Sequence, residues 1–471
     1  MGLYSEKDLT RGNPARNLLG FAVPFLLAYF LQMLYGAVDV IAVGRFGHGS
    51  ADVAAVAAGS EIMQLITSLI TGLTIGATVL IGRSYGAKDS CGVQRCIGMT
   101  LSISLLISVS MTILMIPLIP SIARWLNTPP EAMEQTIAYS AICSWGLVFI
   151  FGYNSLSAIF RGLGNSKAPL LFVGIACVTN IIGDIVMVVV LDMGVRGVAF
   201  ATVASQALSM IVAGGVLYRS NLGFRFHPRD FRITPHLAWE YLKIGIPIGI
   251  QGMIVGFSFL FIFAVINGMG VIATAGYGIC NKINGFAMLP ALSFSMAISA
   301  VTAQNIGAGK PVRALRMLWL GIGYTMMFGI LSLALLQCFP TRFVTFFLDP
   351  TGKDAMATIN AATQYIRSFS FELILVPIVF CTNGFFNGCG RSFFSMANNV
   401  GCTFFVRVPA AYVFCHFLGG TLFEVGWSAP LASFVSNVIA LLYLWSGKWK
   451  PISRLLYVGS DSLDVPGLKK R

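Results

Sequence analysis

Twelve apolar stretches constrain this chain more than any other feature, because each is long enough to cross a lipid bilayer as a helix. Spanning the hydrocarbon core takes about 20 apolar residues. Only 10% of the 471 residues are charged, whereas a soluble chain carries about 25%. The sequence therefore predicts an all-α polytopic membrane protein. The predicted spans are 17–44, 53–81, 97–120, 135–159, 168–191, 195–218, 240–268, 274–306, 317–340, 364–386, 393–416 and 425–446.

Lysine and arginine residues collect in alternate connecting segments. When the segment before the first span is taken as cytoplasmic, 23 of the 31 Lys and Arg residues, Arg161 among them, fall in inner segments and six in outer ones. Lys282 and Arg407 lie within spans. This positive-inside distribution predicts that both termini are cytoplasmic. It also explains the net charge of +13 by topology, so no nucleic-acid partner is expected.

Motifs of the first half recur in the second half at shifts of about 221–223 residues. GFAVP (20–24), GRFG (44–47) and IGRSYGAKD (81–89) have the counterparts GIP (245–247), NGMG (267–270) and AQNIGAGK (303–310). Two parallel copies of six spans predict two pseudo-symmetric lobes, an organisation found in secondary transporters. The predicted divisions are an N-terminal lobe (1–218), a cytoplasmic linker (219–239), a C-terminal lobe (240–446) and a cytoplasmic tail (447–471).

The fifth span contains two polar residues whose burial in a membrane costs free energy. Asn180 and Asp184 lie four residues apart and share one helix face, and an ionisable residue inside an apolar span by default marks an ion or substrate pathway. At 1.5 Å per residue, Asp184 and Thr202 both lie roughly 12 Å below the outer surface. Asp39 in the first span falls at a similar depth. Oxygen-bearing side chains from three helices at one level predict a cation site.

These features together resemble the multidrug and toxic-compound extrusion (MATE) family. YGAVDVIAVGRFG in the first span, IGRSYGAKD after the second, RGLGNSKAP after the fourth and AQNIGAGK after the eighth carry the resemblance, which covers nearly the whole chain. The first lobe is most similar to the prokaryotic DinF-like branch, and the implied fold is twelve transmembrane helices in two six-helix lobes.

The resemblance also implies a polar site in the N-terminal lobe. Asp39, Asn180, Asp184 and Thr202 would form the cation-coupling group, with Na⁺ as one candidate ion. Pro24 would be the proline about which the first helix bends. Ser157 departs from the family pattern, which has asparagine there. The substrate-binding residues would be Gln32, Tyr35, Tyr139 and Asn154.

The C-terminal lobe lacks the matching acids, since Ile occupies position 262 and Ala position 410. It has two buried charges of its own, Glu372 and Arg407, which suit either a second cation or substrate site or a buried structural pair.

Glu61 and Lys282 occupy near-equivalent places in the second and eighth spans. They could attract each other across a central cleft when its outer side is closed, or each could be hydrated separately.

No enzyme is indicated, because the sequence has neither a Walker A motif nor HExxH, and no CxxC pair suggests a metal site. We expect no cofactor. Two neighbouring carboxylates, such as Asp39 and Asp184, repel each other when both are ionised, so the pair takes up H⁺ readily. An oxygen-rich site also suits Na⁺.

The sequence thus predicts a monomeric antiporter in a bacterial or archaeal cytoplasmic membrane, exporting amphipathic, cationic small molecules in exchange for H⁺ or Na⁺. The alternatives are a lipid or lipid-linked oligosaccharide flippase of the same superfamily, and a passive channel or membrane receptor.

Overall fold

A computed structural model describes residues 7–47, 49–126, 128–220, 227–348, 354–417 and 420–450. Most of the predicted C-terminal tail therefore lies outside the described residues. The first half contains α1 (Pro14–Phe46), α2 (Ser50–Gly86), α3 (Ser90–Trp125), α4 (Pro130–Trp145), α5 (Leu147–Gly162), α6 (Lys167–Asp184), the π-helical turn η1 (Ile185–Val190) and α7 (Gly194–Arg219). A short 3₁₀ turn, η2 (Pro228–Phe231), precedes the second half. The second half contains α8 (Pro235–Asn267), α9 (Val271–Gly307), α10 (Pro311–Cys338), α11 (Pro340–Thr345), α12 (Ala355–Phe369), α13 (Glu372–Gly388), α14 (Ser392–Cys402), the π-helical turn η3 (Thr403–Arg407), α15 (Val408–Phe417), α16 (Leu422–Gly426) and α17 (Ser428–Trp445).

The prediction of an all-α chain with twelve spans is confirmed. Within the described residues, ten helices are long and apolar enough to cross a membrane, and two bent pairs bring the number to as many as twelve. The spans predicted at 135–159 and 364–386 each correspond to a pair of helices joined at a bend. The pair α4 and α5 is bent by 50°, and the pair α12 and α13 by 52°. Apolar composition fixes the length of a span but not its direction.

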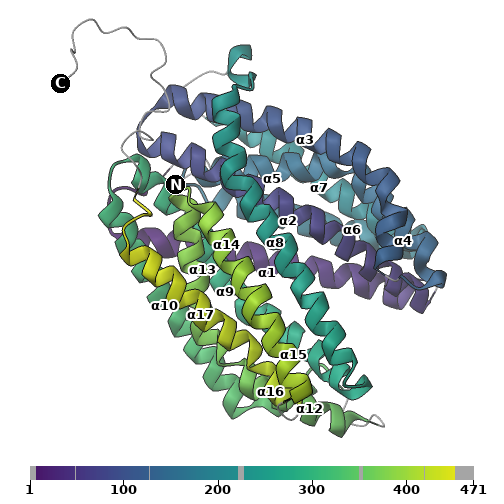
Figure 1. The fold of residues 1–471 in the computed structure, drawn as a ribbon. Coiled ribbons are helices and arrows are strands. Elements are labelled where there is room, and N and C mark those ends of the chain that lie inside the picture. Colours follow the sequence, from purple (N-terminus) through teal and green to yellow (C-terminus); the bar gives the residue numbers. More distant parts are fainter. Residues whose placement is uncertain are drawn as a thin grey trace, which may run out of the picture.

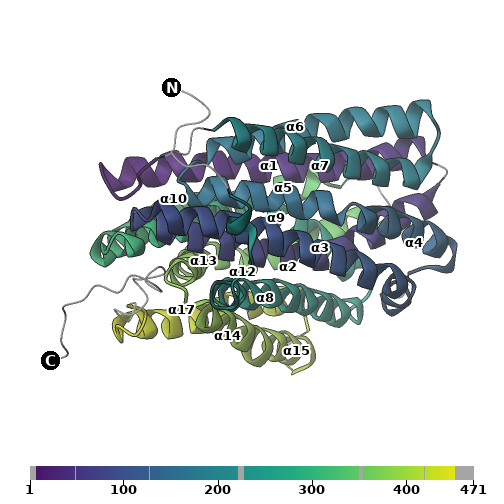
Figure 2. The same ribbon diagram turned by 90° about the horizontal axis from the view of Figure 1, so that it is seen from above.

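The two halves form a V (Figure 1). The helices of the first half, drawn purple to blue, and those of the second half, green to yellow, converge near the label N and diverge toward the opposite end. Seen from above, α1, α6 and α7 of the first half lie along one side of the molecule and α14, α15 and α17 of the second half along the opposite side (Figure 2). We call the converging end, where α1 begins and α2 ends, the basic end, because Arg83, Lys88 and Lys310 lie there, and the other the far end.

The first helix of each half crosses into the core of the other half. Leu18 and Phe21, at the start of α1, pack with α9 and α10 residues such as Ala297 and Met317. Ala28, one turn beyond Pro24, belongs to the core of the first half. The start of α1 therefore packs against residues of the second half, and the lobe boundaries stay a prediction.

The same crossing occurs in α8. Tyr241 and Ile244 pack in the core of the first half, whereas Ile262 and Ile266 pack in the second. Pro247 lies between these two groups, as Pro24 does in α1. Because a proline removes one hydrogen bond of the helix interior and favours a bend, both crossings occur where the helix is weakest.

Glycines let the two halves approach closely along α2 and α8. A Cβ atom on Gly72 would overlap the backbone of Gly249 in α8, and one on Gly245 would lie 2.8 Å from the Cα of Leu73. Side chains at these positions would force the helices apart, since cores do not absorb added volume without strain.

The segment before α1 ties the halves together at the basic end. The buried Leu9 donates its backbone N–H to Oε1 of Gln304 in α9 at 3.1 Å. The same Gln304 side chain donates through Nε2 to the carbonyl of Gly162 in α5 at 2.9 Å, and Lys310 Nζ donates to the carbonyl of Thr10 at 3.0 Å. The side-chain amide of Gln304 thus bridges both halves and the N-terminal segment.

Candidate functional site

Three helices bring the four predicted coupling residues together. The Asp39 carboxyl on α1 lies within hydrogen-bonding reach of the Asp184 carboxyl and the Asn180 amide on α6. Nδ2 of Asn180 lies 3.5 Å from Oγ1 of Thr202 on α7. The exposed fractions of the three α6 and α1 side chains are 6% for Asp39, 1% for Asn180 and 0% for Asp184. The sequence spacing placed these residues at one depth, and the fold makes them neighbours.

The local backbone at Asp184 is unusual. Asp184 is the last α-helical residue of α6, and the π-helical turn η1 follows directly. A π turn inserts an extra residue into the hydrogen-bonding ladder and often accompanies a functional site. Apolar periodicity gives no sign of this turn, so sequence analysis missed it.

The buried oxygens of this cluster lack hydrogen-bond donors. Oδ1 of Asp39, Oδ1 of Asn180 and both carboxyl oxygens of Asp184 are inaccessible and receive no hydrogen bond. Two buried carboxylates side by side repel each other, and a buried acceptor without a donor is itself costly. Protonating one carboxyl would create a donor between them, and a hard cation would be ligated by the same oxygens. The cluster is therefore chemically suited to take up a positive charge.

A cavity of about 510 Å³ adjoins the cluster. Asp39 and Thr202 line it, whereas Asn180 and Asp184 are not among the lining residues and are reached through Asp39. All four predicted substrate-binding residues line the cavity as well: Gln32, Tyr35, Tyr139 and Asn154. Apolar wall is supplied by Met33, Met63 and Met296, the last from the second half. Mixed apolar and polar walls of this size suit a drug-sized amphipathic molecule.

Sequence analysis missed a polar stripe on α2. Its members recur at alternating spacings of four and three residues, so they share one helix face. That periodicity was the available signal. The stripe lines the cavity and consists of Ser60, Gln64, Thr67, Thr71 and Thr74.

Three further lining residues were also missed. Tyr153 is the neighbour of Asn154 and interacts with Gln32 through a side-chain hydrogen bond. Gln206 follows Thr202 by four residues on α7 and therefore lies on the same face. Arg161 follows Asn154 by seven residues on α5, again on one face. The sequence places Arg161 in an inner segment after the fourth span, and in the structure it is a buried residue in the last turn of α5.

Pro24 lies inside α1, which continues through it as one helix from Pro14 to Phe46. It stands between the part of α1 that packs on the second half and the part that carries Gln32, Tyr35 and Asp39. A bend there would therefore move the cavity residues relative to the other lobe.

Glu372 and Arg407 are both buried, with exposed fractions of 7% and 8%. They interact electrostatically, but no ion pair within 4.0 Å joins them in the described part of the chain. Oε1 of Glu372 accepts from Ser433 Oγ at 3.2 Å, and the Arg407 guanidinium lies 4.4 Å from the ring centroid of Phe259. The choice between a structural pair and a binding site stays open.

Glu61 and Lys282 are exposed, and they form no ion pair with each other within the described ranges. Their attraction was predicted for a state closed at the far end, whereas the halves diverge there (Figure 1). The pairing therefore stays a prediction.

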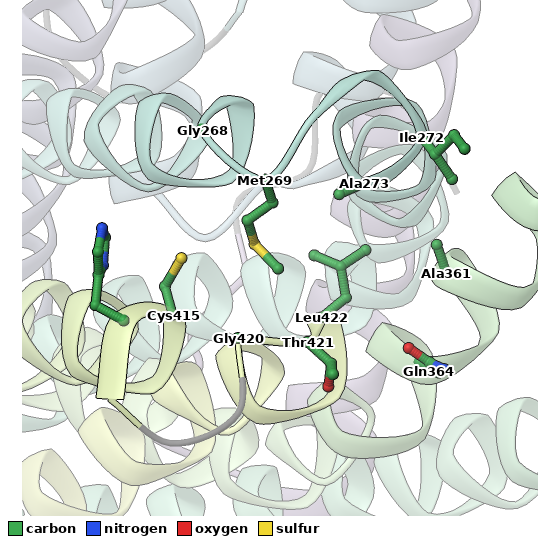
Figure 3. Close-up of a pocket in the computed structure, with 11 residues that line it drawn as sticks. Gly268, Met269, Ile272, Ala273, Ala361, Gln364, Cys415, Gly420, Thr421 and Leu422 are labelled. Carbon is green, nitrogen blue, oxygen red and sulfur yellow. The ribbon is translucent and has the colours of Figure 1, made fainter.

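A second pocket lies in the second half at the far end, between the α8–α9 turn, α12 and the α15–α16 turn (Figure 3). Met269, Cys415, Gln364 and Thr421 are among its lining residues. None of the described residues that line it has a carboxylate, so these residues offer no counterpart of the Asp39 cluster. Within the described residues, no group of three or more His, Cys, Asp or Glu side chains is placed to hold a metal ion.

A family model described as MatE matches the chain twice, over residues 24–186 and 247–413. The chain belongs to the MATE family. The two matches begin at Pro24 and Pro247, the prolines of the two crossing helices.

Relatives and solved structures agree with this assignment. The chain is 26% identical to the probable multidrug resistance protein YpnP of Bacillus subtilis, over 94% of this chain and 97% of the relative. A solved MOP-superfamily transporter from Pyrococcus furiosus superposes with a TM-score of 0.88 at 24% identity, covering 94% of this chain and 98% of that one. A second solved chain, described as the outward-facing conformation of a multidrug resistance MATE transporter, gives the same TM-score, identity and coverage. This MATE protein is accordingly a multi-pass membrane protein whose relatives are transporters.

Proposed function

We propose that the protein is a secondary antiporter that exports amphipathic small molecules bearing a cationic group in exchange for H⁺ or Na⁺. The observation that carries the proposal is the contact between Asp39 and Asp184, with its unsatisfied buried oxygens, at the wall of a cavity large enough for such a molecule. The names of relatives such as YpnP support multidrug cargo. No cofactor is needed for this exchange.

The exchange follows from competition for one negative site. With the acids uncompensated, a cationic substrate in the cavity lies beside Asp39 and is favoured. Binding of H⁺ or Na⁺ neutralises the pair and removes that attraction. The ion shifts the equilibrium between the inward-open and outward-open arrangements of the lobes only by its difference in affinity for the two. In this proposal, α1 bends at Pro24.

The diverging far end fits an arrangement open to the outside, since the basic end is the predicted cytoplasmic side. This orientation rests on the positive-inside distribution. We therefore place the protein in a bacterial or archaeal cytoplasmic membrane as a monomer, with both termini in the cytoplasm.

Proteoliposomes loaded with a fluorescent amphipathic cation test the proposal. An imposed ΔpH or ΔNa⁺ should drive the dye against its own concentration gradient, and whichever gradient does so identifies the coupling ion. Equilibration without accumulation under both gradients would indicate a channel. Scrambling of a labelled lipid without movement of the dye would favour a flippase.

A further inference from the structure

The cavity has a second charged residue whose role the exchange mechanism does not explain. Of the described residues that line it, Asp39 is the one carboxylic acid and Arg161 the one strong base. Arg161 is 8% exposed. Its Nε donates to Oγ1 of Thr78 on α2 at 3.4 Å, and no acidic side chain forms an ion pair with it in the described part of the chain.

The neighbours of Arg161 do not neutralise it. The side chains that interact with it electrostatically are the phenols of Tyr29 and Tyr153. Both tyrosines also line the cavity. A guanidinium removed from bulk water costs several kcal/mol unless an anion or a full set of acceptors compensates it. One long hydrogen bond to a threonine is far from a full set, so the guanidinium faces the cavity with donors to spare.

Arg161 and Asp39 lie at opposite ends of the cavity. Arg161 is near the level of Tyr29, and Tyr29 and Asp39 are ten residues apart on α1, which is roughly 15 Å along the helix axis. The α2 stripe of Ser60, Gln64, Thr67, Thr71 and Thr74 spans the distance between them, and the next residue at the same spacing is Thr78, the partner of Arg161. The cavity thus has an acidic residue, Asp39, at one end, the cationic Arg161 at the other, and a polar wall between them.

We propose that Arg161 forms an anion-accepting subsite, and that the cavity prefers amphipathic zwitterions whose cationic group lies toward Asp39 and whose carboxylate lies at Arg161. The planar guanidinium offers paired donors that match a carboxylate. A volume of about 510 Å³ suits a drug-sized zwitterion and is too small for the two acyl chains of a membrane phospholipid. The inference rests on the proposed function and specifies its substrate class.

A matched pair of dyes tests the preference. One is a styrylpyridinium cation with a carboxypentyl tail on the ring nitrogen, and the other is its methyl ester, which keeps the cation and loses the anion. Fluorescence titration of the protein in lipid nanodiscs gives a Kd for each. The full-length protein should bind the acid about ten-fold more tightly than the ester, the effect of one desolvated charge pair. Equal affinities in the unmodified protein would overturn the inference without any variant.

Three variants separate a binding role from a structural one. Arg161→Gln should bring the ratio of the two Kd values to about one, and Arg161→Lys, which keeps the charge but loses the paired donors, should leave a ratio of a few-fold. Arg95→Gln removes an exposed charge of the same lobe outside the cavity and should leave the ratio unchanged. If Arg161 only braced α5 against α2, its substitution would weaken both dyes equally, and the unchanged ratio would refute the subsite.

The same dyes distinguish this inference from the proposed function. Gradient-driven export of the ester and the acid at equal affinity would remove the subsite and leave the antiporter intact. Failure of both dyes to move under either gradient, with binding retained, would instead count against the antiporter.

Discussion

The helices α1 and α8 open the two halves at corresponding places, yet they serve different purposes. Each begins in the other lobe's core, contains a proline at the transition, and continues into its own lobe. Beyond the proline, α1 directs Gln32, Tyr35 and Asp39 at a polar cavity. The residue of α8 that corresponds to Asp39 is Ile262, which is 1% exposed in an apolar core.

The difference shows that the scaffold and the chemistry are separable. Crossing helices with a proline at the transition recur in both halves. The contact between two buried acids is found in the first half at Asp39 and Asp184, and position 262 of the second half is apolar. We therefore expect coupling to reside in the N-terminal lobe, and four experiments test that expectation.

The largest effect is expected from neutralising the acid pair. Asp39→Asn and Asp184→Asn should each reduce gradient-driven export by at least about 100-fold, because the amide cannot accept the charge that drives the exchange. Initial rates in proteoliposomes under ΔpH and ΔNa⁺ measure this. Glu372→Gln, which neutralises a buried acid of the second half, is the matched control and should keep a substantial rate. An equally complete loss in Glu372→Gln would place coupling in both lobes.

Moving the acid to the second half should destabilise the protein without adding coupling. Ile262→Asp introduces an unpaired carboxyl into an apolar core and should cost about 3–5 kcal/mol. Thermal unfolding in detergent measures the loss, and Ile262→Val, with an expected cost of about 1 kcal/mol, controls for altered packing. A stable Ile262→Asp protein would mean that the second lobe can accommodate a charge as readily as the first.

The two prolines should differ in their effect on turnover. Pro24→Ala restores a helix hydrogen bond beside the segment that carries the cavity residues, and export should slow about 5–10-fold while dye affinity changes little. Pro247→Ala should slow it less, because no coupling residue follows it on α8. Export rates and Kd values measured side by side decide this, and equal slowing would show that both helices bend in the cycle.

The smallest effect is expected from Glu61 and Lys282. Glu61→Lys and Lys282→Glu should each slow export about two- to three-fold, because an exposed pair contributes little, and the double exchange should restore the rate. The matched test is a double-mutant cycle on export rate. Purely additive losses would mean that the two charges never meet.

Several features followed from the sequence by itself. Twelve stretches of apolar residues dictated the helical membrane class, since the bilayer leaves few other options. The repeated motifs implied two related halves. Asn180 and Asp184, four residues apart, had to share a face, and counting residues placed Asp39 and Thr202 at their depth.

Only the tertiary structure decided which elements belong together in space. No local pattern shows that the start of α1 packs on the second half, because apolar periodicity marks a buried face without naming its partner. The π turn after Asp184 and the 50° bend between α4 and α5 leave no mark in the apolar periodicity. Arg161 is the clearest case. Its position at the end of a span reads as a cytoplasmic anchor, and only the packing of α2 against α5 turns it into a charge inside the cavity.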